Sequence, residues 1–213
     1  MNTLLVVDIQ NDFLPGGALA VGDGDRIVPI INLLMDHFDS VLATQDWHPS
    51  DHGSFAANHP GHSQGDRIDL NGIPQILWPV HCVQDSAGAA FSPDLRRDRF
   101  VRIFQKGIDP KIDSYSAFFD NAHLRSTGLA EYLSEHRADQ IFICGLATDY
   151  CVKFSALDSR KLGLNTAVIE DACRGVNLDP DDSNNAIDEI RKSGALITSS
   201  DEILKRFPKR SSK

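Results

Sequence analysis

Short apolar runs alternate with helical patterns along most of this chain, and this alternation restricts its fold more than any other feature. Residues 3–10 have the composition of a strand, and residues 25–38 carry apolar side chains at the spacing of one helix face. Strands that are separated by helices pair in parallel through right-handed crossovers. The remaining predicted strands are 40–45, 100–106, 140–146, 166–170 and 195–198. Helices are predicted at 124–137, at 181–194, and from a cap at Thr148 or Asp149 to residue 163. A capping box from Ser199 to Glu202 opens a last, short helix.

We therefore expect a three-layer α/β/α fold whose central, mostly parallel sheet has about six strands. The chain of 213 residues is long enough to bury one full hydrophobic core, and no change of composition along it indicates a second domain. We expect a single domain over residues 1–204. A tail with five basic residues, 205–213, has the composition of a solvated terminus.

The net charge of −9 argues against partners that need a basic face, which are nucleic acids and anionic membranes. No apolar stretch reaches the length that spans a bilayer. The first residues lack the basic segment and cleavage site of a secretion signal and run directly into the first strand. The four cysteines are irregularly spaced and include no Cys-x-x-Cys pair, so we expect reduced thiols and a cytoplasmic protein.

One long segment, residues 47–99, breaks the alternation. It shows little periodicity, yet it holds both tryptophans, five of the eight histidines and five of the ten prolines. Long irregular segments inside a compact domain are usually either functional or disordered. Because disorder would not favour two tryptophans, we interpret 47–99 as a metal- and substrate-binding loop region.

Chemically active side chains follow the ends of four predicted strands, where parallel α/β sheets bind their ligands. The first set is Asp8, Lys106 and Cys151. Cys151 lies in the first turn of a predicted helix, whose partial positive charge lowers the pKa of a thiol. Asp8 offers a base for the thiol proton, and Lys106 offers a charge that stabilises the resulting anions. A buried structural cysteine and a structural ion pair between Asp8 and Lys106 are the alternatives.

The second set combines Asp46 and His48 with the distant His81. Residues two apart on an extended segment project to the same side, so Asp46 and His48 can bind one ion together. Two histidines and one carboxylate suit zinc, iron or manganese and leave coordination positions open. Three histidines between these residues offer a fourth ligand, and the sequence does not choose among them; they are His52, His59 and His62.

Five separated motifs resemble those of the nicotinamidase/pyrazinamidase group within the isochorismatase-like cysteine hydrolases. They occur in the order typical of that group, and with two further segments they cover nearly the whole chain. The motifs are Val7-Asp8-Ile9-Gln10-Asn11-Asp12-Phe13, Gln45-Asp46-Trp47-His48-Pro49, Trp78-Pro79-Val80-His81-Cys82, Lys106-Gly107 and Gly145-Leu146-Ala147-Thr148-Asp149-Tyr150-Cys151. The further segments are Tyr115-Ser116-Ala117-Phe118-Phe119 and Asp171-Ala172-Cys173-Arg174-Gly175-Val176.

The resemblance implies hydrolysis of nicotinamide to nicotinate and ammonia, a reaction of NAD salvage, together with activity on pyrazinamide. It implies that Cys151 attacks the carboxamide carbon, that Asp8 takes the thiol proton and later delivers it to ammonia, and that Lys106 completes the triad. The backbone N–H groups of Ala147 and Cys151 would hold the oxyanion, beside a cis peptide bond between Leu146 and Ala147.

The same resemblance assigns one divalent metal ion to Asp46, His48 and His81, with zinc as the first choice and iron or manganese as alternatives. The pyridine nitrogen of the substrate fills an open position, so the metal orients the substrate and need not activate water. Three aromatic side chains would pack against the flat pyridine ring of the substrate: Phe13, Trp78 and Tyr115. Some members of the group have a further histidine six residues after the second ligand, where this chain has Ser54, so we expect three protein ligands.

Other functions fit these residues less well. An amidase that acts on a carbamoyl or ureido substrate would share the Asp–Lys–Cys set but not this metal motif. Isochorismatase itself lacks the nucleophilic cysteine, and a zinc hydrolase that uses metal-bound hydroxide would leave Cys151 idle. A binding protein would be expected to have lost a catalytic position, and none is missing. The expected partner is nicotinamide, and the sequence leaves a homo-oligomer open.

Overall fold

The computed structural model describes residues 1–138 and 140–209. Its centre is a sheet of six strands, all paired in parallel, in the order β5-β2-β1-β6-β7-β8. The strands are β1 (Asn2–Val7), β2 (Ser40–Asp46), β5 (Arg102–Lys106), β6 (Gln140–Leu146), β7 (Asn165–Arg174) and β8 (Leu196–Thr198). Every predicted strand is present, and β6 has the predicted bounds.

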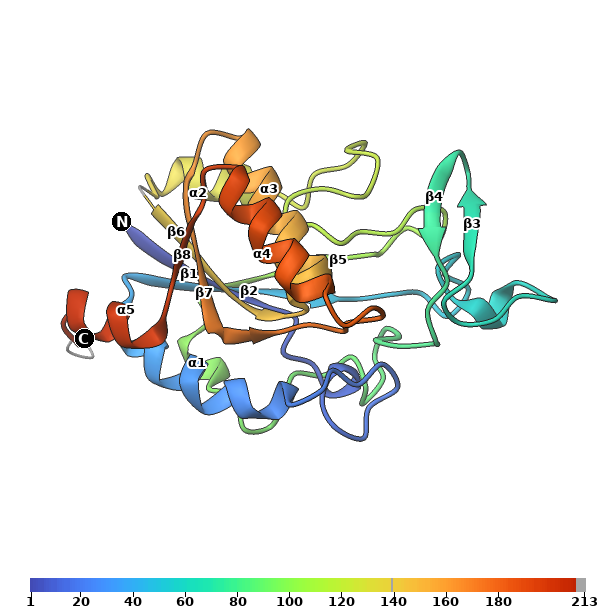
Figure 1. The fold of residues 1–213 in the computed structure, drawn as a ribbon, viewed down its shortest axis with the longest axis horizontal. Coiled ribbons are helices and arrows are strands. Elements are labelled where there is room, and N and C mark those ends of the chain that lie inside the picture. Colours follow the sequence, from blue (N-terminus) through green and yellow to red (C-terminus); the bar gives the residue numbers. More distant parts are fainter. Residues whose placement is uncertain (139, 210–213) are drawn as a thin grey trace.

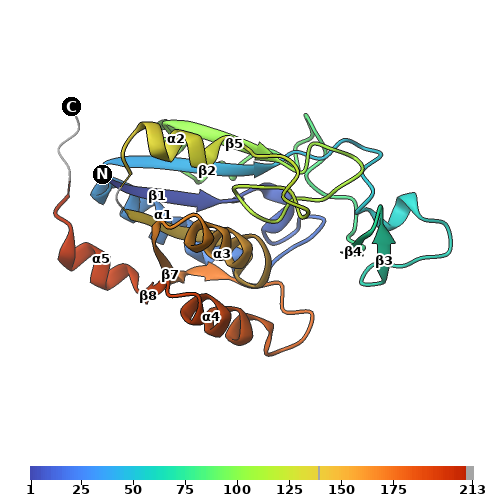
Figure 2. The ribbon, with the colours of Figure 1, turned by 90° about the horizontal axis from the view of Figure 1, so that it is seen from above.

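Helices cover both faces of this sheet, as Figure 1 and the view from above in Figure 2 show. One face carries α2 (Leu129–Glu135), α3 (Lys153–Lys161) and α4 (Asp182–Lys192), and the other carries α1 (Val28–Leu34) and α5 (Ser200–Arg206). The three-layer α/β/α fold predicted from the sequence is confirmed. Shorter 3-10 turns are Asn11–Phe13, Gly24–Ile27, Met35–His37, Ala56–Asn58 and Arg97–Arg99.

Strand β1 occupies the middle of the sheet, between β2 and β6. It is covered on both faces, which explains why Leu4, Leu5, Val6 and Val7 are consecutive apolar residues without exposed surface. Strands β2 and β5 lie on one side of β1, and β6, β7 and β8 lie on the other. In a doubly wound sheet, the ligand site lies beyond the carboxyl ends of the strands at this switch point. The ends of β1, β2, β5 and β6 therefore meet where a site is expected.

The helix predicted over residues 124–137 is shorter than expected, because α2 begins only at Leu129. Gly128 has a φ of 86°, a left-handed conformation that interrupts a helix. The Asp120 carboxylate accepts the backbone N–H groups of Leu124 and Arg125 and holds them in a loop. Local side-chain hydrogen bonds thus replace the first predicted turn.

The helix after β6 begins with a π-helical turn, Thr148–Val152, and continues as α3. Ala147 precedes this turn in an extended conformation, so neither predicted capping residue caps the helix. The Asp149 carboxylate instead accepts the backbone N–H groups of Val176 and Asn177. This contact ties the turn to the chain that follows β7.

The last helix agrees with its predicted start. The capping box between Ser199 and Glu202 is present and opens α5. Since α5 extends to Arg206, the predicted basic tail begins inside this helix, and its residues 210–213 lie outside the described residues. Among the helices that the structure describes, none combines the length and the apolar character needed to cross a bilayer.

Residues 47–99 contain one feature that the sequence prediction missed. An antiparallel hairpin of β3 (Arg67–Leu70) and β4 (Ile73–Ile76) projects from the body of the molecule (Figure 1). Its turn is Asn71-Gly72, with φ values of 55° and 87°, as a type I′ turn requires. Asn-Gly between two short strand-like runs is a strong hairpin signal, and it was available in the sequence.

Candidate active site

Three of the predicted site residues meet at the carboxyl edge of the sheet. Lys106 is the last residue of β5, Asp8 follows β1, and Cys151 lies in the π-helical turn after β6. The Lys106 Nζ lies 2.9 Å from the Asp8 Oδ2 and 3.3 Å from the Cys151 Sγ. All three residues are buried. The structure therefore brings together the first set that the strand ends predicted.

The Lys106 ammonium is surrounded by acceptors. Besides Asp8 and Cys151, it contacts the Asp46 Oδ1 and donates to the Ser114 carbonyl at 3.1 Å. Burial alone would lower its pKa, but the carboxylates of Asp46 and Asp8 outweigh burial and hold the pKa of Lys106 well above its usual range. Lys106 is therefore a cation at neutral pH.

Asp8 is held in one orientation. The Thr44 Oγ1 donates to its Oδ1 at 2.7 Å, while its Oδ2 faces Lys106. Complete burial raises the pKa of Asp8 to about 6, against the attraction of Lys106. A carboxylate whose pKa lies near neutrality can both accept a proton and return it during one turnover.

The environment of Cys151 differs from the prediction. Its position at the start of a helix predicted a lowered pKa, but burial raises the pKa of this thiol well above its usual range. Lys106 opposes the shift, while the carboxylates of Asp8 and Asp46 add to it. With the residue only 7% exposed, loss of water around a thiolate outweighs the charge of the helix end. Cys151 is therefore a neutral thiol at rest and needs a base when it reacts.

The turn between β6 and its helix has an unusual backbone. The peptide bond between Leu146 and Ala147 is cis, as the resemblance implied. Gly145 has a φ of 121°, and a Cβ at this position would lie 2.1 Å from the Val7 carbonyl oxygen. Only glycine fits so close an approach of two backbones. The approach brings the turn that carries Cys151 next to the end of β1.

Asp46, His48 and His81 form a second group beside the first. One oxygen of the carboxylate and one nitrogen of each ring all lie within 4.8 Å of one another. The His48 Nδ1 bonds to the Gly107 carbonyl at 2.9 Å, and the His81 Nδ1 bonds to the Pro79 carbonyl at 2.8 Å. The two Nε2 atoms face the Asp46 Oδ2 at 3.8 and 4.0 Å. Because carbonyl acceptors hold the proton on Nδ1 and leave Nε2 free, this donor set fits a divalent cation.

The two histidines differ in basicity. Burial and the neighbouring His48 lower the pKa of His81 to about 4, so His81 is neutral at neutral pH. Burial would also lower the pKa of His48, but the contact with Asp46 outweighs burial and raises it. Burial would raise the pKa of Asp46, and the charges of Lys106 and His48 instead hold it well below its usual range. The group therefore presents a full carboxylate to a cation.

Of the three histidines that offered a fourth ligand, the structure brings only His52 near this group. Its ring centroid lies 4.3 Å from that of His48, and its Nδ1 is 2.7 Å from the Ser54 hydroxyl. His59 bonds instead to a backbone carbonyl, and His62 lies at the surface. The residue at the position of the additional family histidine, Ser54, thus contacts His52.

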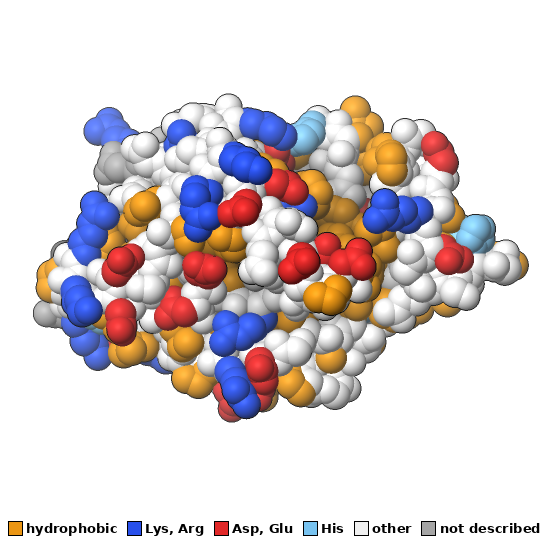
Figure 3. Space-filling model, in the orientation of Figure 1, with side chains coloured by type: hydrophobic (Ala, Val, Ile, Leu, Met, Phe, Trp, Pro, Cys, Tyr) orange, Lys and Arg blue, Asp and Glu red, His pale blue; other side chains and the backbone are white. Residues whose placement is uncertain are grey.

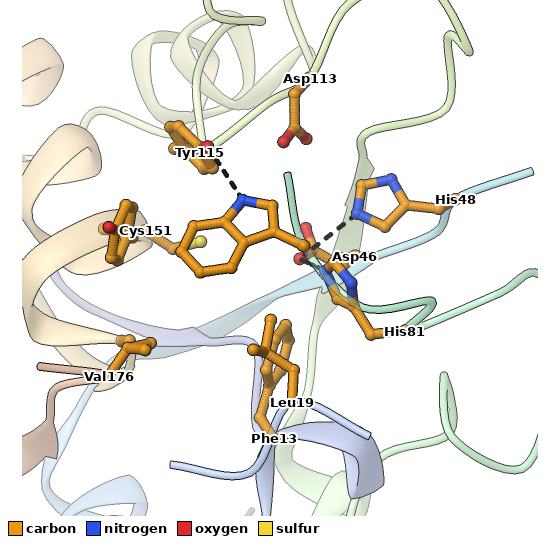
Figure 4. A pocket seen from close by; sticks show the side chains of 12 residues that line it. Phe13, Leu19, Asp46, His48, His81, Asp113, Tyr115, Cys151 and Val176 are labelled. Carbon is orange, nitrogen blue, oxygen red and sulfur yellow. Dashed lines mark hydrogen bonds and ion pairs between the residues drawn. The ribbon is translucent and has the colours of Figure 1, made fainter. Parts of the chain in front are cut away.

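Aromatic side chains line the pocket in front of Cys151 (Figure 4). The three that the resemblance named are all present in its wall: Phe13, Trp78 and Tyr115. The Trp78 Nε1 donates to the Tyr115 hydroxyl at 3.0 Å. The ring centroids of Phe13 and His81 are 5.5 Å apart. Flat apolar walls beside a cation-binding group suit a planar ring that carries a polar atom.

The sequence prediction missed four residues of the same pocket, which are Leu19, Asp113, Tyr150 and Val176. The Tyr150 ring packs edge-on against Trp78, with centroids 4.9 Å apart. Asp113 is buried, accepts a hydrogen bond from Gln75 at 3.0 Å, and offers an oxygen within 4.8 Å of two histidine nitrogens. Tyr150 and Val176 stand in segments that carry the family resemblance, whereas the only signal for Asp113 is its position two residues before Tyr115.

A wider hollow of about 420 Å³ adjoins this pocket and shares Tyr115 and Tyr150 with it. It lies between the β3–β4 hairpin, which contributes Arg67, and the helices α3 and α4, which contribute Lys153 and Asp182. Figure 3 shows the surface hollowed at this place, with hydrophobic side chains inside it and charged side chains around it. We interpret the hollow as the approach to the pocket.

Comparisons with known proteins identify the family of this chain. A profile of the isochorismatase domain matches residues 2–202. The nicotinamidase of Escherichia coli (strain K12) is 49% identical over 198 residues, which cover 91% of this chain and 92% of that protein. The structure of an Acinetobacter baumanii nicotinamidase pyrazinamidase has a TM-score of 0.93 and 46% identity, with 95% of this chain and 98% of that chain covered. The pyrazinamidase of Pyrococcus horikoshii, solved in complex with zinc, has a TM-score of 0.76 and 36% identity, with 93% and 98% covered.

These matches extend over nearly the whole length of this chain and of its relatives. The chain therefore belongs to the isochorismatase family. Within that family it lies in the nicotinamidase/pyrazinamidase group that its motifs resemble.

Proposed function

We propose that this chain hydrolyses nicotinamide to nicotinate and ammonia through a thioester on Cys151. The observation that carries the proposal is the position of the Lys106 ammonium, which lies 2.9 Å from Asp8 and 3.3 Å from the Cys151 sulfur. The activities named for the similar proteins support the same substrate, and the reaction would return nicotinate to NAD salvage.

In the first half of the reaction, Asp8 takes the thiol proton while the Cys151 sulfur attacks the carboxamide carbon. Negative charge then develops on the carbonyl oxygen. The backbone N–H groups of Ala147 and Cys151 are the proposed donors to this oxyanion, and one such donor contributes about 3 kcal/mol to lowering the barrier. Asp8 returns its proton to the nitrogen, the carbon–nitrogen bond breaks, and ammonia leaves.

In the second half, Asp8 removes a proton from a water molecule, and the resulting hydroxide attacks the thioester carbon. The carbon–sulfur bond breaks, and the proton that Asp8 holds restores the Cys151 thiol. The carboxylic acid formed gives its proton to solvent and leaves as nicotinate. Lys106 stays protonated in both halves, so its role is to stabilise the charges on Asp8 and on the sulfur.

Asp46, His48 and His81 would hold one divalent cation, with zinc as the first choice and iron or manganese as alternatives. When bound, the cation supplies a Lewis acid for the pyridine nitrogen of the substrate. Phe13, Trp78 and Tyr115 would pack against the ring and hold it in the orientation that this contact gives.

The test is ammonia release from nicotinamide by the wild-type chain and by Cys151→Ala, together with elemental analysis of both proteins. We expect the variant to lose activity while its metal content stays normal. Full activity in Cys151→Ala would contradict the thioester mechanism.

A second candidate substrate class, the carbamoyl and ureido compounds, would use the same Asp–Lys–Cys group. The same assay with pyrazinamide and with a carbamoyl compound separates the two classes. Release from the pyridine and pyrazine amides, and not from the carbamoyl compound, is the expected result. The reverse order would replace the proposed substrate.

A further inference from the structure

The side chain of Gln10 pairs with both backbone groups of Asp46. The Gln10 Nε2 donates to the Asp46 carbonyl at 2.8 Å, and the Gln10 Oε1 accepts the Asp46 N–H at 2.8 Å. The same Nε2 also donates to the Ala89 carbonyl at 2.9 Å. Gln10 has no exposed surface, so water cannot replace any of these three bonds without a rearrangement.

This pairing takes the place of a strand. In the described sheet, β1 pairs with β2 only as far as Ala43, and the chain turns away at Asp8, whose φ is 49°. The opposite edge of β2 pairs Asp46 with Lys106 of β5. A carboxamide has the donor and the acceptor of a peptide group, so Gln10 continues the ladder on the β1 side by one step.

We propose that Gln10 is a positioning residue that directs the Asp46 carboxylate toward its two groups of partners. The proposal rests on the proposed function, in which Asp46 is a metal ligand. A rotation of the Asp46 backbone would carry Oδ1 away from Lys106 and Oδ2 away from His48. Gln10 is not among the residues that line the described pocket, so its side chain would act on the site through the Asp46 backbone that it binds.

Gln45 provides a matched control. It precedes Asp46 in β2, it is buried, and its Nε2 donates to the same Ala89 carbonyl at 2.9 Å. Its Oε1 accepts from Gln105 rather than from Asp46. Gln10→Met and Gln45→Met therefore each remove a buried hydrogen bond to the Ala89 carbonyl at nearly constant volume, and only Gln10→Met also releases the Asp46 backbone.

The experiment measures zinc affinity by competition with a chromogenic chelator for the wild type and both variants. Loss of a residue that supports a metal ligand weakens metal binding by about 10- to 100-fold, which is the change expected for Gln10→Met. Gln45→Met should stay within about twofold of the wild type, because its contacts do not reach Asp46. At saturating zinc, kcat for nicotinamide should remain reduced in Gln10→Met, since the contact of Asp46 with Lys106 is also disturbed.

Equal zinc affinities in the two methionine variants would overturn the role of Gln10. A wild-type chain that binds no zinc or releases no ammonia would overturn the proposed function instead. Gln10→Glu is measured in parallel and serves if Gln10→Met does not fold. It keeps the acceptor for the Asp46 N–H but turns a carboxylate oxygen toward the Asp46 carbonyl, so zinc affinity should fall here as well; an unchanged value would count against Gln10.

Discussion

Asp46 and Lys106 stand opposite each other in the register of β2 and β5, and their side chains are in contact. The Asp46 Oδ1 faces Lys106, and its Oδ2 faces His48 and His81. One carboxylate therefore belongs both to the group around Cys151 and to the group that fits a cation. A substitution in either group should therefore also alter the properties of the other.

Removal of the buried lysine charge should destabilise the fold as well as stop the reaction. Lys106→Met leaves the carboxylates of Asp8 and Asp46 without their cation, and breaking a buried ion pair in this way costs about 3–5 kcal/mol. Urea unfolding measures this loss. Lys153→Met is the control, because its pair with the half-exposed Glu189 should contribute less than about 1 kcal/mol. Equal losses in the two variants would show that the buried charges are compensated in another way.

The pH dependence of kcat/KM should report Asp8. A base accepts a proton only in its ionised form, so activity should fall about tenfold per pH unit as the pH drops below about 6. Thr44→Val removes a hydrogen bond that favours ionised Asp8 and should move this limb to higher pH. Thr44→Ser keeps the hydroxyl and should restore the wild-type position. An identical limb in all three proteins would exclude Thr44 from this role.

Chelation should lower stability and abolish activity together. A cation that binds only the folded chain, present at 100 times its dissociation constant, adds about 2.7 kcal/mol to the free energy of unfolding. Thermal unfolding with and without zinc after treatment with a chelator measures this difference. His81→Gln should remove the response, and His62→Gln, a change at the surface, should keep it. A zinc response that survives in His81→Gln would place the cation elsewhere.

The wall of the pocket should control substrate affinity more than turnover. Trp78→Phe keeps an aromatic ring but removes the hydrogen bond to the Tyr115 hydroxyl, a loss of about 1 kcal/mol. KM for nicotinamide should rise about fivefold with little change in kcat. A fall in kcat at constant KM would instead mean that Trp78 acts on the transition state.

Much of the fold could be predicted because buried strands and helix faces leave periodic patterns in the sequence. The strand at residues 140–146 was found with its bounds, and Asp8, Lys106 and Cys151 follow from the rule that parallel strands end at one edge. The hairpin at Asn71-Gly72 was missed, although its turn residues are characteristic, because its strands are too short to show a period.

Other features depend on contacts between segments far apart in the chain. Thr44 bonds to Asp8, and Gln10 to Asp46, across 36 residues in each case, and neither pair can be read from local pattern. The pKa of Cys151 was predicted in the wrong direction for a related reason. A helix start is visible in the sequence, whereas the burial that outweighs it exists only after the chain has folded.

The central place of β1 has a consequence for synthesis of the chain. Among the described strands β1 is synthesised first, yet its second neighbour, β6, is complete only at Leu146, more than half of the 213 residues later. Until then one edge of a strand with four consecutive apolar residues, 4–7, has no partner, and unpaired edges of this kind are prone to aggregate. The pairing that later brings Cys151 beside Asp8 is thus also the one that ends the most vulnerable stage of the nascent chain.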